Sequence, residues 1–159
     1  MKKAILIMIL GICLSSPVSG EPLLSAICGE PSGPRIDISP EMSGNSGASI
    51  EHSKDKYSGV HPLFTVDADE PNTLKYVWGN TEIAGDSLAD VPTSERSAKI
   101  QIFNENIVSA VEVYKSNRVS VFTLLPKIGI GVFTDHTRTT VLGENVKAVT
   151  FTSDCRFLK

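Results

Sequence analysis

The fold is decided by AKIQIFNENIVSAVEVYKSNRVSVFTLLPKIGIGVFT (Ala98–Thr134), where apolar residues recur at every second position. Turn-forming residues interrupt this alternation at Asn104–Asn106, at Lys115–Arg118 and at Pro126. Alternation with a period of two is typical of half-buried strands, and short polar breaks are typical of tight turns. The stretch therefore predicts an antiparallel β-meander.

Two glycines stand near the end of this stretch. Ile130 and Val132 alternate with Gly129 and Gly131. Glycine inside a strand permits sharp bending or the close approach of another backbone. This pattern predicts a sheet that bends strongly at its last turn.

The last predicted strand brings a cysteine to the core. In the segment Lys147–Phe157, Val149 and Phe151 share one face with Cys155. Cys28 lies near the other end of the mature chain, and two cysteines of an exported protein are expected to pair. We therefore predict one disulfide, Cys28 to Cys155, that links the first strand to the last.

The first half of the chain predicts further strands. Alternation indicates strands at Arg35–Ser39, His61–Val66 and Leu74–Gly79, with Trp78 as a core anchor. Between the first two of these, Pro40–Ser58 is polar and rich in glycine and serine, which predicts a long irregular loop. Together with the meander, these strands predict an all-β, antiparallel β-sandwich, with a closed or partly closed β-barrel as the alternative.

Residues 1–20 have the composition of a secretory signal peptide. Lys2 and Lys3 precede the apolar segment Ala4–Leu14, and the small-residue segment Ser15–Gly20 follows it. We expect cleavage before Glu21 and a single β domain over residues 21–159. An eleven-residue apolar segment is too short to span a bilayer as a helix, so no transmembrane helix is expected in the mature chain. The predicted location is periplasmic or extracellular.

Charge narrows the class of partner. Without Lys2 and Lys3 the chain has 13 basic and 18 acidic residues, a formal charge of −5. An acidic domain without a basic patch is not expected to bind nucleic acid or an anionic membrane. The oligomeric state is left open.

The histidines and acidic residues form no ligand pattern. His52, His61 and His136 lack the short spacing of a zinc site, and the acidic segment Asp67–Glu70 lacks the glycine and glutamate of a calcium-binding loop. We interpret the acidic segment as a solvated hairpin turn. No metal and no cofactor are predicted.

One pair of titratable residues adjoins a predicted strand. Asp135 and His136 begin the polar segment Asp135–Thr139, which predicts a turn. Neighbouring residues of a strand point to opposite faces, so Asp135 would orient His136 only if the chain turned there. We therefore predict no catalytic residue, and a solvated turn is favoured over an acid/base site.

Two functions remain for such a domain. The favoured one is a non-catalytic exported binding protein, whose partner is an envelope or extracellular protein bound through the loop Pro40–Ser58 or an exposed sheet face. The alternative is a small secreted or periplasmic hydrolase with a site built from the loops that hold His52, His61 and His136. Because the sequence has no nucleophile or ligand motif, a binding role is preferred over an enzyme.

Overall fold

The computed structural model describes residues 20–40, 48–78, 83–84, 87–88, 95–115, 117–139 and 145–158. The predicted signal peptide, residues 1–20, lies outside these ranges except for Gly20. The described residues form strands and turns without a helix, which confirms the all-β prediction. Within the same ranges, no helix is long and apolar enough to cross a membrane.

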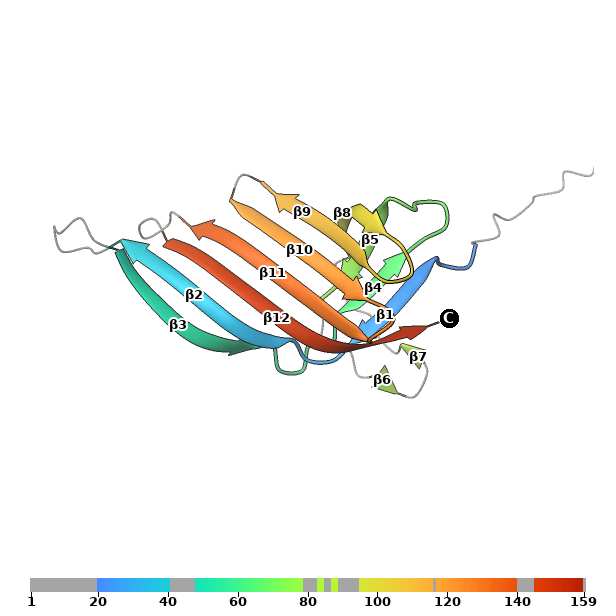
Figure 1. The fold of residues 1–159 in the computed structure, drawn as a ribbon, viewed down its shortest axis with the longest axis horizontal. Helices are drawn as coiled ribbons and strands as arrows, with labels where there is room; N and C mark the ends of the chain where they lie inside the picture. Colours follow the sequence, from blue (N-terminus) through green and yellow to red (C-terminus); the bar gives the residue numbers. More distant parts are fainter. Residues whose placement is uncertain are drawn as a thin grey trace, which may run out of the picture.

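Twelve strands follow one another along the described part of the chain. They are β1 (Leu24–Cys28), β2 (Ser32–Pro40), β3 (Ala48–Lys56), β4 (Leu63–Val66), β5 (Thr73–Val77), β6 (Ile83–Ala84), β7 (Ser87–Leu88), β8 (Arg96–Phe103), β9 (Val108–Tyr114), β10 (Arg118–Leu125), β11 (Ile130–Thr139) and β12 (Asn145–Leu158). β6 and β7 form a small sheet, and the other ten strands form one antiparallel sheet (Figure 1). The predicted meander is confirmed as the neighbouring strands β8 to β11.

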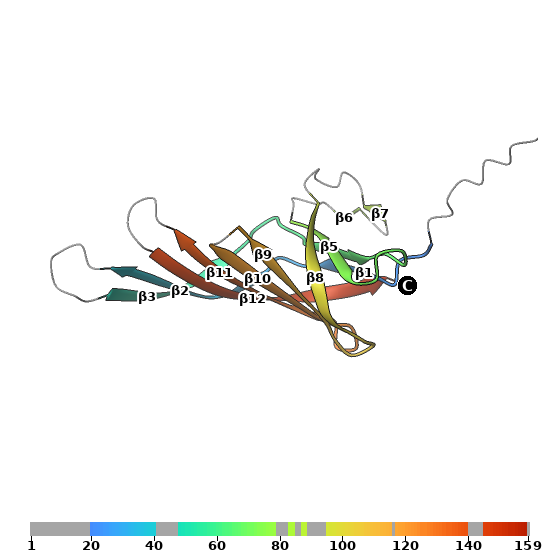
Figure 2. The same cartoon turned by 90° about the horizontal axis from the view of Figure 1, so that it is seen from above.

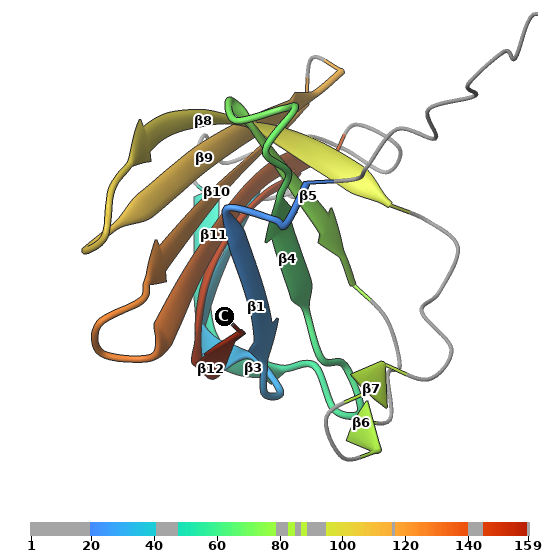
Figure 3. The ribbon, with the colours of Figure 1, turned by 90° about the vertical axis from the view of Figure 1, so that its right-hand side faces the viewer.

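The large sheet closes on itself. β1 pairs with β4 along one edge and with β12 along the other. The ring runs through β1, β4, β5, β8, β9, β10, β11 and β12, an eight-stranded barrel seen along its length in Figure 3. Of the two predicted architectures, the barrel alternative is therefore the one observed. Cys28 lies directly opposite Cys155 in the closing pair, and the disulfide between them confirms the predicted link between terminal strands.

β12 is long enough to have two partners on one edge. Its residues 146–152 pair with β2, and its residues 155–158 pair with β1. The β2–β3 hairpin therefore extends the sheet beyond the ring (Figures 1 and 2). We call the end completed by β1, β4 and β5 the closed end, and the end where β9 to β12 continue to β2 and β3 the open end.

The structure contradicts the loop predicted over Pro40–Ser58. Residues 48–56 form β3, which pairs with β2 from Ala48 to Lys56. β3 is the last strand of the sheet, and nearly all of its side chains face solvent. A strand at an exposed edge needs no apolar alternation, so its sequence resembles a polar loop. Residues 41–47 lie outside the described ranges.

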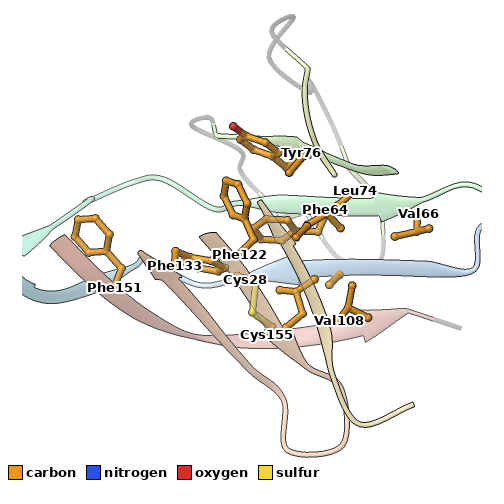
Figure 4. Packing of buried hydrophobic residues seen from close by; sticks show 14 of the residues in the cluster. Cys28, Phe64, Val66, Leu74, Tyr76, Val108, Phe122, Phe133, Phe151 and Cys155 are labelled. Carbon is orange, nitrogen blue, oxygen red and sulfur yellow. A yellow bond between two sulfur atoms is a disulfide. The ribbon is translucent and has the colours of Figure 1, made fainter. Parts of the chain in front are cut away.

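The core fills the closed end of the barrel. Side chains that point inward from all eight strands of the ring form one buried cluster, in which Leu74, Val108 and Leu124 are fully covered. Aromatic rings occupy its centre, and Phe64 lies with its ring centroid 5.2 Å from that of Phe133 (Figure 4). A hypothetical Cβ on Gly131 would lie 2.8 Å from the sulfur of Cys155, so glycine is needed where β11 passes the disulfide.

Candidate functional site

The two cysteines belong to the core rather than to a reactive site. Cys28 is 1% exposed and Cys155 is 9% exposed, and both side chains lie in the buried cluster. A disulfide of this kind stabilises the fold by restricting the unfolded chain. Neither cysteine lines the cavity described below.

The three histidines do not converge. His52 lies on β3 and His136 on β11, and both are exposed to solvent. His61 is partly buried in the segment that precedes β4. None of the three lines the cavity described below.

The polar segment Asp135–Thr139 is a strand, and the predicted turn is wrong. All five residues belong to β11, with Asp135 opposite Ser120 and His136 opposite Val119. Because neighbouring strand residues face opposite sides, Asp135 points into the barrel while His136 points to solvent. Asp135 is a polar residue of a strand that faces a partly polar cavity. The prediction treated polar residues as a sign of a turn and did not consider a strand with polar inward side chains.

A cavity of about 370 Å³ lies against the inner face of β10, β11 and β12, where the closed end meets the open end. Five aromatic side chains, two arginines and one aspartate contribute most of its wall. Its lining residues are Tyr57, Val60, Trp78, Arg96, Arg118, Ser120, Phe122, Phe133, Thr134, Asp135 and Phe151. Ligand cavities of this size, apolar with a few polar groups, are common in the mouths of β-barrels.

Aromatic rings form the apolar wall of the cavity. The ring of Tyr57 lies 4.8 Å from that of Phe151 and 5.7 Å from that of Trp78, centroid to centroid. Trp78 in turn meets Phe133 edge to face at 5.5 Å. The rings are tilted against each other by 51° to 80°, so they form a concave surface rather than a stack. Burial raises the pKa of Tyr57, which keeps its phenol neutral.

Arg96 is held rigidly at one side of the cavity. It donates from Nε and Nη2 to Oε1 of Glu112 at 3.1 and 2.8 Å, and from Nη2 to Oε2 at 2.8 Å. Its guanidinium carbon lies 5.7 Å from the ring centroid of Tyr76 and 5.1 Å from that of Tyr114. Such paired charges and cation–π contacts fix the guanidinium before any ligand arrives.

Tyr76 completes this cluster from β5. Its hydroxyl donates a 2.5 Å hydrogen bond to Oε2 of Glu112. Burial, and then the hydrogen bond and the charge of Glu112, raise the pKa of Tyr76. The hydroxyl therefore keeps its proton and remains a donor to the carboxylate.

A second ion pair lies beside the first. Arg118 binds Asp135 with two contacts, Nε to Oδ1 at 3.0 Å and Nη2 to Oδ2 at 2.8 Å. The hydroxyls of Ser120 and Thr137 each donate to Oδ1 of Asp135 at 3.4 Å. Arg118 and Asp135 keep 35% and 23% of their side-chain surface exposed, so both polar groups face the cavity.

Further ion pairs continue along the inner face of the open end. Arg35 lies opposite the buried Val149 and donates from Nε and Nη2 to Asp37 at 2.6 and 2.9 Å. Asp55 lies 3.4 Å from Arg35 and 3.7 Å from Lys147. The hydrogen bond from Arg35 and its charge lower the pKa of Asp37. The inner face of the sheet therefore changes from apolar at the closed end to ionic at the open end.

For most of the cavity residues, the sequence did not predict a place in a functional site. Trp78 was expected as a core anchor; it packs half-buried against the core cluster and also lines the cavity. Arg118 and Asp135 were predicted to lie in turns. A signal was present: Arg118 and Ser120 share the inward phase of Phe122. Extending that phase to the end of each predicted strand would have placed polar side chains inside the barrel.

Comparison of the chain with protein families, with curated proteins and with solved structures gives no match. Among the described residues, no group of three histidine, cysteine, aspartate or glutamate side chains is arranged to hold a metal ion. The cavity is therefore the feature from which a function is proposed.

Proposed function

We propose that the mature chain is an exported, non-catalytic binding protein whose barrel cavity receives a small and largely apolar molecule. The observation that carries the proposal is the aromatic surface of Tyr57, Trp78, Phe133 and Phe151 beside the arginines of the same cavity. Aromatic side chains offer a large apolar contact area with little conformational freedom to lose. Fixed polar groups at one side would orient the bound molecule.

A binding role fits the cavity better than hydrolysis. Hydrolysis by a serine requires a base within hydrogen-bond reach of the hydroxyl. Ser120 contacts Asp135 at 3.4 Å, but it is only 3% exposed, and the described lining includes no histidine. A hydrolase remains the lesser alternative.

Export is part of the proposal. The signal-like segment over residues 1–20 and the buried Cys28–Cys155 disulfide both support it, because disulfides persist in oxidising compartments. The envelope or extracellular protein predicted as partner stays a prediction. In addition to that protein partner, we propose a small molecule as a ligand of the cavity.

A fluorescent apolar probe tests the proposal. The mature, oxidised chain is titrated with N-phenylnaphthylamine, whose emission rises when it leaves water, while quenching of the single tryptophan, Trp78, is followed in parallel. We expect saturable binding in which both signals give the same Kd. Probe binding without any change in Trp78 emission would place the site elsewhere and contradict the proposal.

A pair of aromatic deletions locates the probe. Tyr57→Ala removes a cavity ring, whereas Phe103→Ala removes a ring of similar exposure, 42% against 38%, at the end of β8. Loss of one aromatic contact should weaken probe binding about tenfold, since tenfold corresponds to about 1.4 kcal/mol. Phe103→Ala should leave the Kd unchanged.

A further inference from the structure

The charges around the cavity cancel. Of the described residues, Arg96 and Arg118 stand against Glu112 and Asp135, and every one of these charges has a bonded partner of opposite sign. The adjoining inner face repeats the pattern, because Arg35 and Lys147 stand against Asp37 and Asp55. The cavity is therefore polar at one side without being charged overall.

A charged guest would disturb this balance. An anion that bound Arg118 would compete with Asp135, whose two oxygens already accept from the guanidinium. Arg96 is similarly occupied by both oxygens of Glu112, which is only 13% exposed. A charged group beside these pairs would have no partner of its own unless it separated one of them, and separating a partly buried pair leaves one of its charges uncompensated.

The remaining polar surface suits a neutral group. Arg118 offers N–H donors and Asp135 offers carboxylate acceptors, side by side, with Nη2 of Arg118 2.8 Å from Oδ2 of Asp135. A hydroxyl, amide or amine of an uncharged guest both donates and accepts, so it would bond to the pair without separating it. The tilted aromatic rings would cover the apolar body of the same guest.

We propose that the cavity selects uncharged molecules over charged ones, namely those with a flat apolar body and one polar end that donates and accepts hydrogen bonds. This inference rests on the proposed function, since it specifies the class of molecule that the same cavity takes. The inference concerns only the polar group of the ligand. It is therefore tested with pairs of ligands that have the same aromatic rings and differ in the charge of that polar group.

Two matched probes supply that change. N-phenylnaphthylamine is uncharged, and anilinonaphthalene sulfonate has the same rings with an added sulfonate. Both are titrated into the mature, oxidised chain, with the emission of the probe and of Trp78 as readouts. We expect the neutral probe to bind at least about tenfold more tightly, the factor that corresponds to about 1.4 kcal/mol.

A cation completes the comparison. Naphthylmethanol and naphthylmethylammonium share one ring system, and their binding is measured by calorimetry at neutral pH. The alcohol should bind more tightly than the ammonium ion by a similar factor. Tighter binding of the ammonium ion would overturn the inference.

Charge variants test the cause of the selectivity. Asp135→Asn leaves Arg118 without its partner, so we expect the affinity for the sulfonate to rise and the difference between the probes to shrink at least fivefold. Arg118→Met leaves Asp135 alone, and the difference should grow. Asp154→Asn makes the same change in net charge at an exposed site of β12 opposite Ile130, outside the cavity lining, and should leave the difference unchanged.

The outcomes separate the two proposals. If neither naphthylamine probe changes the emission of Trp78, the proposed function itself is contradicted, and the inference fails with it. If both bind and the sulfonate binds as tightly as the neutral probe, the binding role stands and the selectivity is contradicted. A probe difference that Asp135→Asn leaves unchanged would also overturn the inference.

Discussion

The closed end and the open end of the barrel share the strands β9 to β12 but have interiors of opposite character. From the closed end to the open end, the inward residues of β10 are Leu124, Phe122, Ser120 and Arg118. β9 and β11 change in the same direction and present Glu112 and Asp135 at the open end. The closed end thus buries apolar surface, which stabilises the fold, while the open end presents partly exposed ion pairs, which contribute little stability. The cavity lies at the boundary between them.

If the closed end holds most of the stability, deleting a ring there should have the largest effect. Phe64 is 1% exposed and contacts the rings of Tyr76, Phe122 and Phe133. Phe64→Ala should lower the free energy of unfolding by about 3–5 kcal/mol, measured by urea denaturation. The same substitution at the exposed Phe103 should change it by less than about 0.5–1 kcal/mol. Equal losses at both sites would contradict the division between the ends.

Loss of the disulfide should cause the second-largest decrease in the free energy of unfolding, because the disulfide links the strand pair that closes the ring. Replacing both Cys28 and Cys155 by alanine should cost about 2–4 kcal/mol of stability in the same assay. Reductant should destabilise the parent chain by a comparable amount and leave the double variant unaffected. A variant as stable as the parent would show that ring closure does not depend on the crosslink.

A smaller loss is expected where the ring meets the open sheet. A Cβ on Gly33 would lie 1.9 Å from the carbonyl oxygen of Thr150, so Gly33→Ala must push β2 away from β12. We expect a loss of about 1–3 kcal/mol. Gly29→Ala is the control, because its Cβ would meet Ser153 and Asp154 at ordinary distances of 3.6 and 3.7 Å. Similar losses for the two variants would argue against the close strand contact at Gly33.

The smallest effect concerns the ion pairs of the open end. Arg35 holds the pKa of Asp37 below its ordinary value, so the unfolded chain takes up this proton first as the pH falls. The stabilisation from Asp37 is therefore present above about pH 4 and is lost as the pH falls through the folded pKa. Urea denaturation should show Asp37→Asn less stable at neutral pH by at most about 1 kcal/mol, with the difference vanishing in acid. A pH-independent difference, or one matched by Asp69→Asn in the exposed β4–β5 turn, would contradict this cause.

The sequence predicted the closed end far better than the open end. Alternation identifies the strands that cover the core, and the two cysteines identify the pair that closes it. The sequence could not distinguish a sandwich from a barrel, because the difference depends on the pairing of β1 with both β4 and β12, which joins residues far apart in the chain. β3 was missed because an exposed edge strand lacks an apolar face, and the end of β11 was missed because Asp135 is polar and inward-facing. The cavity was not predicted, since its walls come from segments between Tyr57 and Phe151 that only the folded barrel brings together.

A binding site at the boundary of the two interiors is tested by mapping the amide chemical shifts of the mature chain with and without N-phenylnaphthylamine. We expect the probe to shift the signals of Tyr57, Trp78 and Phe133 around the cavity, while those of Val66 and Val108 at the closed end stay in place. Shifts centred instead on outward residues such as Val113, or on the closed end, would contradict a binding site at the boundary of the two interiors.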